Sequence, residues 1–285
     1  AIISVFLGEQ LEDVLRQLIS TGEATRSIQG GTLETGVATL PNLVKDATDR
    51  NRTSPMAFTG NKFEFRMVGS QDSVAEPNVV MNAIVAEAFS EAADFLEKAE
   101  DFEMAVHDLI KEYAAEHYRI VFNGNGYSEE WVEEAKRRGL PNIRSMVDAI
   151  PALVTDKAVT LYEKFGIYTR SELESRAEIS YEAYAKAINI EAKTMIDMAS
   201  KHIIPAVIRA VQKLAESMTC VTNACPEADV SVQKELLLET SAYLSETKQA
   251  LSRLIKETDA AALIERSEQR ARMYHDRVVP EMEAL

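Results

Sequence analysis

The chain has 285 residues, of which 46% are hydrophobic and 27% charged. This composition is typical of a soluble globular protein and excludes collagen-like, disordered and membrane-spanning classes. The 31 basic and 46 acidic residues give a net charge of −15. Because such a surface repels phosphate backbones and anionic lipids, we expect neither nucleic acid nor a membrane as a partner. Cys220 and Cys225 are too few for a disulfide framework and indicate free thiols in the cytoplasm.

The first part of the chain mixes strand, helix and loop patterns. Residues 2–7 form a short apolar run closed by Gly8, which predicts a buried strand. A core strand so near residue 1 leads us to interpret the chain as the C-terminal part of a longer protein. Helical spacing of leucine and valine predicts a helix over 9–19. Residues 22–36 contain four glycines without periodicity and predict a mobile loop, whereas residues 62–67 alternate as a strand.

Glycine and charge both divide the chain. All 11 glycines lie at or before Gly166, and the last 119 residues contain none, which favours long helices with few tight turns. Residues 1–70 carry 7 basic and 8 acidic groups, whereas residues 71–285 carry 24 and 38. We therefore expect an α+β fold that is predominantly α. Residues 1–76 would be a part with mixed strands, helix and loop, and residues 77–285 a large all-helical domain.

Capping signals and apolar periodicity set the expected helices. Ser128 is typical of an N-cap, and its helix should stop at Gly139. Ser171 and Glu174 have the spacing of a capping box at the start of a long helix in which Pro205 should cause a kink. The predicted helices are 79–98, 102–121, 128–138, 172–218, about 230–256 and 259–278, with a loop over 220–229.

Charged and aromatic side chains alternate on the predicted strand 62–67. Lys62, Glu64 and Arg66 should share one face, and the intervening aromatic residues should pack into a core on the other. A carboxylate is a suitable ligand for a hard divalent cation, and flanking cations suit phosphate or carboxylate oxygens. The pattern therefore fits phosphoryl transfer, in which catalysis is mostly positioning and charge neutralisation. A solvated charge ladder on an antiparallel strand would give the same pattern, and that alternative stays open.

A longer block around this strand resembles a known enzyme family. The run Asn51-Arg52-Thr-Ser-Pro-x-Ala-Phe-Thr-Gly-Asn-Lys-Phe-Glu64-Phe-Arg66 is similar to the catalytic block of type III glutamine synthetases. The opening Ala1–Gly8, the phrase Phe122-Asn-Gly-x-Gly-Tyr127-Ser-Glu-Glu-Trp131 and the helical tail resemble that family as well. The resemblance implies that residues 1–76 complete a glutamine-synthetase-like catalytic sheet and that residues 77–285 supply oligomer contacts.

The resemblance also implies a reaction and roles for four residues. Such enzymes use ATP and Mg²⁺ or Mn²⁺ to join ammonia to glutamate through γ-glutamyl phosphate. Glu64 would be a metal ligand, and Arg66 would be catalytic and contact the glutamate substrate. Arg52 would be catalytic and hold transferring phosphate oxygens, with Lys62 beside the nucleotide. Other family types carry a second arginine at the position of Ala57, so one phosphate or nucleotide contact must differ here.

The remaining site residues of that family, including the other metal ligands and the glutamate-covering loop, lie upstream of residue 1. The chain alone would then be an inactive half-site within a ring-shaped homo-oligomer. Two alternatives stay open: a non-catalytic helical oligomerisation or regulatory module derived from the same family, and a related ligase with a different amine or acid substrate. The four histidines lack the spacing of a helical metal pair, so we interpret them as structural or surface residues.

Overall fold

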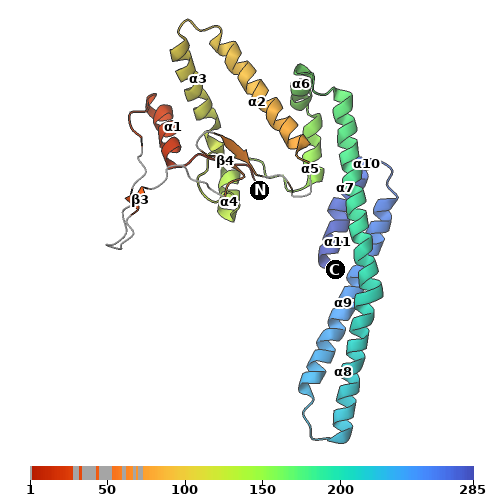
Figure 1. Cartoon of the computed structure of the whole chain (residues 1–285). Coiled ribbons are helices and arrows are strands. Elements are labelled where there is room, and N and C mark those ends of the chain that lie inside the picture. The colour runs from red at the N-terminus through yellow and green to blue at the C-terminus, as the bar shows by residue number, and fades with distance from the viewer. Residues whose placement is uncertain are drawn as a thin grey trace. The chain divides into compact units, whose positions relative to one another are not determined.

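The computed structural model describes residues 2–27, 32–33, 43–44, 53–59, 62–66, 69 and 73–285. The chain divides into two compact units, Ala1–Arg144 and Ser145–Leu285, and each is considered by itself (Figure 1). Helices dominate both units and a small sheet lies in the first, which confirms the predominantly α composition. The predicted boundary between residues 76 and 77 marks a change in sequence character, and it stays a prediction.

The sheet of the first unit places residues near the start of the chain beside residues 56–65. In the described residues it has the order β1-β4-β5, with β1 parallel to β4 and β4 antiparallel to β5. Ile2 and Phe6 are buried, which confirms the buried strand predicted at the start. The strands are β1 (Val5–Phe6), β4 (Met56–Phe58) and β5 (Phe63–Phe65), while β2 (Thr32–Leu33) pairs with β3 (Leu43–Val44).

The helices of the first unit follow the predicted pattern with shifted ends. α2 begins at Ala75 rather than at Val79, because a proline is tolerated in the first turn, where its missing N–H leaves no bond unmade. Ser128 caps α4 as predicted, since its Oγ accepts a hydrogen bond from Trp131 N. Residues 28–31 and 34–36 of the predicted mobile loop lie outside the described residues. The helices are α1 (Glu9–Thr21), α2 (Ala75–Leu96), α3 (Phe102–His117) and α4 (Glu129–Arg137), and a 3₁₀ turn covers Tyr118–Ile120.

The second unit is a helical bundle from which a long hairpin extends. α7 and α8 follow one another almost in line, and α9 returns beside them (Figure 1). Aromatic and small residues of α7 pack on α9 and the C-terminal helices, and Tyr181 is 7% exposed. The helices are α5 (Met146–Ala149), α6 (Asp156–Lys164), α7 (Arg170–Met198), α8 (Ile204–Ala224), α9 (Ser231–Ala262), α10 (Ser267–Met273) and α11 (Val279–Ala284), and a 3₁₀ segment covers Ile150–Val154.

Proline shapes the long helix through a local change of winding. The segment Ala199–Ile203 is a π-helix, and Pro205 lies in the first turn of α8 directly after it. A second π-helix, Tyr274–Val278, precedes Pro280 of α11 in the same way. Proline has no N–H for the carbonyl four residues earlier and its ring crowds that carbonyl, so one wider turn before it accommodates the ring.

Three predicted boundaries in this unit are wrong. The N-cap of α7 is Thr169, with Glu172 completing its capping box, rather than Ser171 with Glu174. Both pairs satisfy the same four-residue pattern, so spacing alone does not choose between them. α8 continues to Ala224, which shortens the loop predicted over 220–229. α9 continues to Ala262, past the break predicted near residue 257, because its buried face is still packed there.

Candidate functional site

The three charged side chains predicted to share one face of strand 62–67 do meet in the structure. Glu64 Oε2 accepts a hydrogen bond from Arg66 Nη2 at 2.9 Å, and Glu64 Oε1 lies 3.6 Å from Lys62 Nζ. The Glu64 side chain is 40% exposed and that of Arg66 is 24% exposed. The fourth predicted site residue, Arg52, lies outside the described residues. The structure therefore brings together Lys62, Glu64 and Arg66.

Backbone bonds fix this charged strand against β4. Glu64 is paired with Ala57 across the two strands, and Thr59 N donates to Lys62 O at 2.8 Å where the hairpin turns. Phe63 contacts the ring of Phe58, with centroids 5.2 Å apart. Phe63 is nevertheless 50% exposed, so the expectation that the aromatic face is buried is wrong for this residue. β5 lies at the edge of the described sheet.

Electrostatics keep the Glu64 carboxylate ionised. The hydrogen bond from Arg66 is the largest effect and lowers the pKa of Glu64; desolvation opposes it, and the charges of Arg66 and Lys62 lower the pKa further. An ionised carboxylate is the hard oxygen ligand that Mg²⁺ and Mn²⁺ prefer. Within the described residues no group of three or more His, Cys, Asp or Glu side chains could hold a metal ion. Glu64 therefore fits one ligand position of a divalent cation, and further ligands are needed.

A second polar cluster ties α1 to the connection between α3 and α4. Asn123 Oδ1 accepts from Leu7 N at 3.0 Å and from Gly8 N at 3.1 Å. Its Nδ2 donates to Glu12 Oε2, and Tyr118 donates to the other oxygen of Glu12. No sequence pattern indicates this cluster, because its partners are more than 100 residues apart. The two asparagine–glycine pairs at 123–126 are the local signal in this region, and they indicate a turn rather than a polar cluster.

The Glu12 carboxylate titrates below its ordinary value. Burial alone would raise its pKa, but hydrogen bonds from Tyr118 and Arg16, the Arg16 charge and the Asn123 bond together lower it from 4.5. The Tyr118 hydroxyl is affected in the opposite sense, since burial and its bond to Glu12 raise its pKa. The ionised form of Glu12 is therefore stabilised relative to the protonated form in the folded protein, compared with the unfolded chain.

Glu12→Gln is expected to reduce stability in a pH-dependent way. Because the folded pKa is lowered, the contribution of the ionised carboxylate is fully present above about pH 4.5 and is lost as the pH falls below that value. Replacing the charged acceptor should cost about 1 kcal/mol of unfolding free energy at pH 7. Urea unfolding at pH 7 and pH 4 measures the difference. The same substitution at Glu9, an exposed residue of the same helix turn, is the control, and equal losses at both positions would contradict the prediction.

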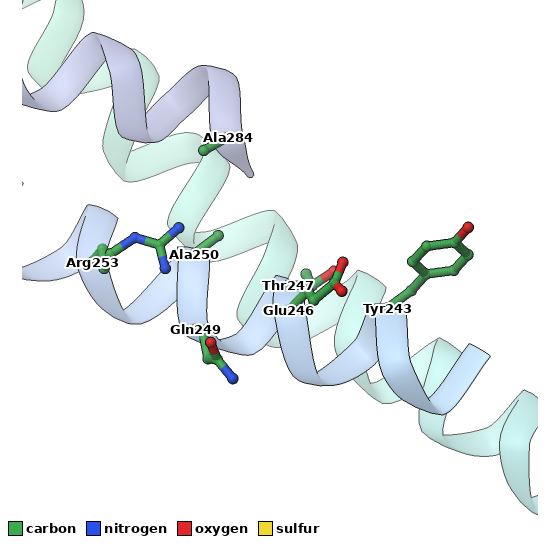
Figure 2. Close-up of a pocket in the computed structure, with 7 residues that line it drawn as sticks. All are labelled: Tyr243, Glu246, Thr247, Gln249, Ala250, Arg253 and Ala284. Carbon is green, nitrogen blue, oxygen red and sulfur yellow. The ribbon is translucent and has the colours of Figure 1, made fainter. Parts of the chain in front are cut away.

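The second unit carries a shallow hollow of about 450 Å³ along α9, drawn in Figure 2. Arg253 at its edge pairs with Glu281 of α11 at 2.8 Å, and Tyr243 donates to Glu239 within α9 at 3.1 Å. These groups are satisfied within the bundle, so we assign no chemistry to the hollow. Its lining residues are Tyr243, Glu246, Thr247, Gln249, Ala250, Arg253 and Ala284.

Comparison with known proteins tests the resemblance suggested by the sequence. Residues 105–222 match the family described as the glutamine synthetase C-terminal domain. The chain is 38% identical over 269 residues to the type-3 glutamine synthetase of Dictyostelium discoideum, a match that covers 90% of this chain and 36% of the relative. By sequence, the chain is similar to the C-terminal part of glutamine synthetases. The resemblance to glutamine synthetases is thereby confirmed.

Two bacterial glutamine synthetases extend the match over the whole chain. That of Butyrivibrio fibrisolvens is 34% identical over 294 residues, which covers 100% of this chain and 41% of the relative. That of Bacteroides fragilis (strain YCH46) is 32% identical over 297 residues, which covers 100% of this chain and 40% of the relative. The chain thus spans about two fifths of the length of these glutamine synthetases. The match of residues 105–222 begins inside α3 and crosses from the first compact unit into the second.

Cys220 and Cys225 are exposed free thiols, as predicted from their number and spacing. In the part of the chain that is described, no helix is both long and apolar enough to cross a membrane.

Proposed function

We propose that this chain acts within an ATP-dependent ligase that joins ammonia to glutamate and forms glutamine. In this reaction the γ-phosphoryl group of ATP passes to the side-chain carboxylate of glutamate, and ADP leaves. Ammonia then attacks the acyl carbon of γ-glutamyl phosphate, and inorganic phosphate leaves. The observation that carries the proposal is the contact of Glu64 with Lys62 and Arg66 on β5, in a chain whose relatives are named glutamine synthetases.

In this proposal each charged residue has a separate task. Arg66 binds the carboxylate of glutamate or of its phosphorylated form through its planar guanidinium. Lys62 lies beside the nucleotide, and Arg52 holds the oxygens of the transferring phosphoryl group. Glu64 supplies one ligand to Mg²⁺ or Mn²⁺, which, when bound, neutralises charge on the phosphoryl oxygens. Glu64 also orients Lys62 and Arg66 through its two carboxylate oxygens.

The rest of the proposal concerns the whole protein. The further metal and substrate ligands would come from a longer polypeptide, and the enzyme would work in the cytoplasm as a ring-shaped homo-oligomer. Exposed apolar side chains on α8 and α9 support subunit contacts through the helical hairpin, because such side chains favour burial in an interface. They are Ile208, Val232, Leu236, Leu238 and Tyr243. The same residues support the second candidate, a helical oligomerisation or regulatory module without catalysis.

One experiment separates these candidates. The full-length protein is given glutamate, ammonium, ATP and Mg²⁺ or Mn²⁺, and glutamine and ADP are measured while the native mass is determined in parallel. We expect equal amounts of glutamine and ADP, formed when all substrates and the metal are present. An assembled oligomer that forms neither product would contradict the ligase and support the module. Product formation with another amine, but not with ammonium, would indicate a related ligase.

A further inference from the structure

The connection between α3 and α4, with the first turn of α4, is hydrogen-bonded to β1 and the residues on either side of it. We call residues Val121–Trp131 the 121–131 segment. At its start, Val121 forms a parallel bridge with Val5, and Phe122 N donates to Val5 O at 3.0 Å. At its end, Trp131 Nε1 donates to Ile2 O at 3.0 Å. With Asn123 holding the amides of residues 7 and 8, the segment fixes β1 and its flanking residues between Ile2 and Gly8.

The middle of the same segment reaches the chain that leads into the charged strand. Gly126 N donates to Thr53 O at 2.7 Å. A Cβ atom on Gly126 would lie 2.9 Å from Ser4 Oγ, 3.0 Å from Pro55 Cδ and 3.2 Å from Thr53 O. These separations are shorter than ordinary van der Waals contacts, so the absence of a side chain at Gly126 lets its backbone approach Ser4 and residues 53–55 closely. The approach joins β1, the 121–131 segment and residues 53–55.

Residues 53–55 connect this meeting point directly to Arg66, one of the proposed site residues. Pro55 O accepts a hydrogen bond from Arg66 N at 2.8 Å, and Ser54 Oγ donates to Ser4 O at 3.3 Å in a buried position. A displacement of residues 53–55 would therefore shift the backbone of Arg66 through this hydrogen bond.

We propose that the 121–131 segment, through Gly126, positions Arg66 for catalysis, an inference that rests on the proposed ligase function. Gly126 is a positioning residue in this scheme and contacts no substrate. Most of the 121–131 segment precedes or begins α4 and all of it lies within the residues that match the C-terminal domain family. The C-terminal domain thus contributes to the geometry of the catalytic block. Errors of about 1 Å in such geometry cost on the order of 100-fold in rate.

Gly126→Ala in the full-length protein tests the proposal. The added methyl group should push residues 53–55 away, so we expect kcat for glutamine formation to fall about 10- to 100-fold with a smaller change in KM for ATP. Amide hydrogen exchange of peptides covering residues 53–66 should become faster. The double variant Ser4→Ala/Gly126→Ala should recover part of kcat, because Ser4 Oγ is the nearest obstacle and has no hydrogen-bond partner in the described structure.

Leu109→Ala is the matched control, since Leu109 is a buried residue of α3 in the same unit. It should lower the melting temperature without changing kcat or exchange at 53–66. Equal effects of Gly126→Ala and Leu109→Ala on kcat, or an unchanged kcat and exchange in Gly126→Ala, would overturn the proposal.

If Gly126→Ala does not accumulate as folded protein, Trp131→Phe replaces it, because it removes the bond to Ile2 O. Its effects on kcat and on exchange at 53–66 should again exceed those of Leu109→Ala. A wild-type protein that forms no glutamine would refute the ligase, whereas the exchange comparison would still decide whether Gly126 holds residues 53–66.

Discussion

Glu64→Gln in the full-length protein is expected to reduce glutamine formation about 100- to 1,000-fold. The substitution keeps the size of the side chain but removes the charge that would bind a divalent cation and balance Lys62 and Arg66. Loss of a charged ligand at a phosphoryl-transfer site costs several kcal/mol of transition-state stabilisation, and each 1.4 kcal/mol is a factor of ten in rate. Initial rates over a titration of Mg²⁺ would measure both the loss of kcat and a rise in the metal concentration needed for half-maximal rate.

Two further variants make this result specific. Glu64→Asp keeps the charge on a shorter side chain, so it should retain more activity than Glu64→Gln while still requiring more metal. Glu133→Gln removes an exposed carboxylate of α4 and should leave the rate unchanged. The native mass of all three variants should equal that of the wild type, because Glu64 is on the surface of β5 and holds no buried packing. Wild-type turnover in Glu64→Gln would refute the role of Glu64 as a metal ligand.

The elements that sequence predicted well are those that depend on neighbours a few residues away. The buried strand at residues 2–7 is apparent from a β-branched run closed by glycine, and the Ser128 cap from a polar residue before acidic first-turn positions. The common face of Lys62, Glu64 and Arg66 follows from the two-residue period of a strand. These local rules specified the part of the candidate site that lies on β5.

The features that sequence missed depend on distant partners or on competing local solutions. Asn123 bonds to amides 115 and 116 residues away, and no spacing rule connects such positions. The capping box of α7 was misplaced because two overlapping pairs fit one pattern. Pro205 predicted a kink in the helix, but it did not predict that a π-helical turn would accommodate the proline ring. Arg52 and its contacts lie outside the described residues, so its role stays a prediction.

Trp131→Ala is expected to lower the free energy of unfolding of the first unit by about 4 kcal/mol. The Trp131 side chain is fully buried, stacks on Phe122 with ring centroids 4.5 Å apart and lies under the guanidinium of Arg138. Large-to-small substitution of a buried aromatic residue costs about 3–5 kcal/mol. Loss of its indole donor also leaves Ile2 O without that bond, at a cost of about 1–3 kcal/mol where no water replaces it.

The measurement is urea unfolding followed by circular dichroism, since Trp131 is the single tryptophan and fluorescence would vanish with it. Trp131→Phe separates the two contributions, because it keeps an aromatic ring against Phe122 while deleting the bond to Ile2 O. It should lose about 1–2 kcal/mol. Amide exchange should become faster at residues 2–8 in both variants, since β1 is held at Ile2 through this indole. A loss below 1 kcal/mol for Trp131→Ala, with unchanged exchange at residues 2–8, would mean that β1 is held by its strand partners alone. The 121–131 segment would then not be needed to fix it.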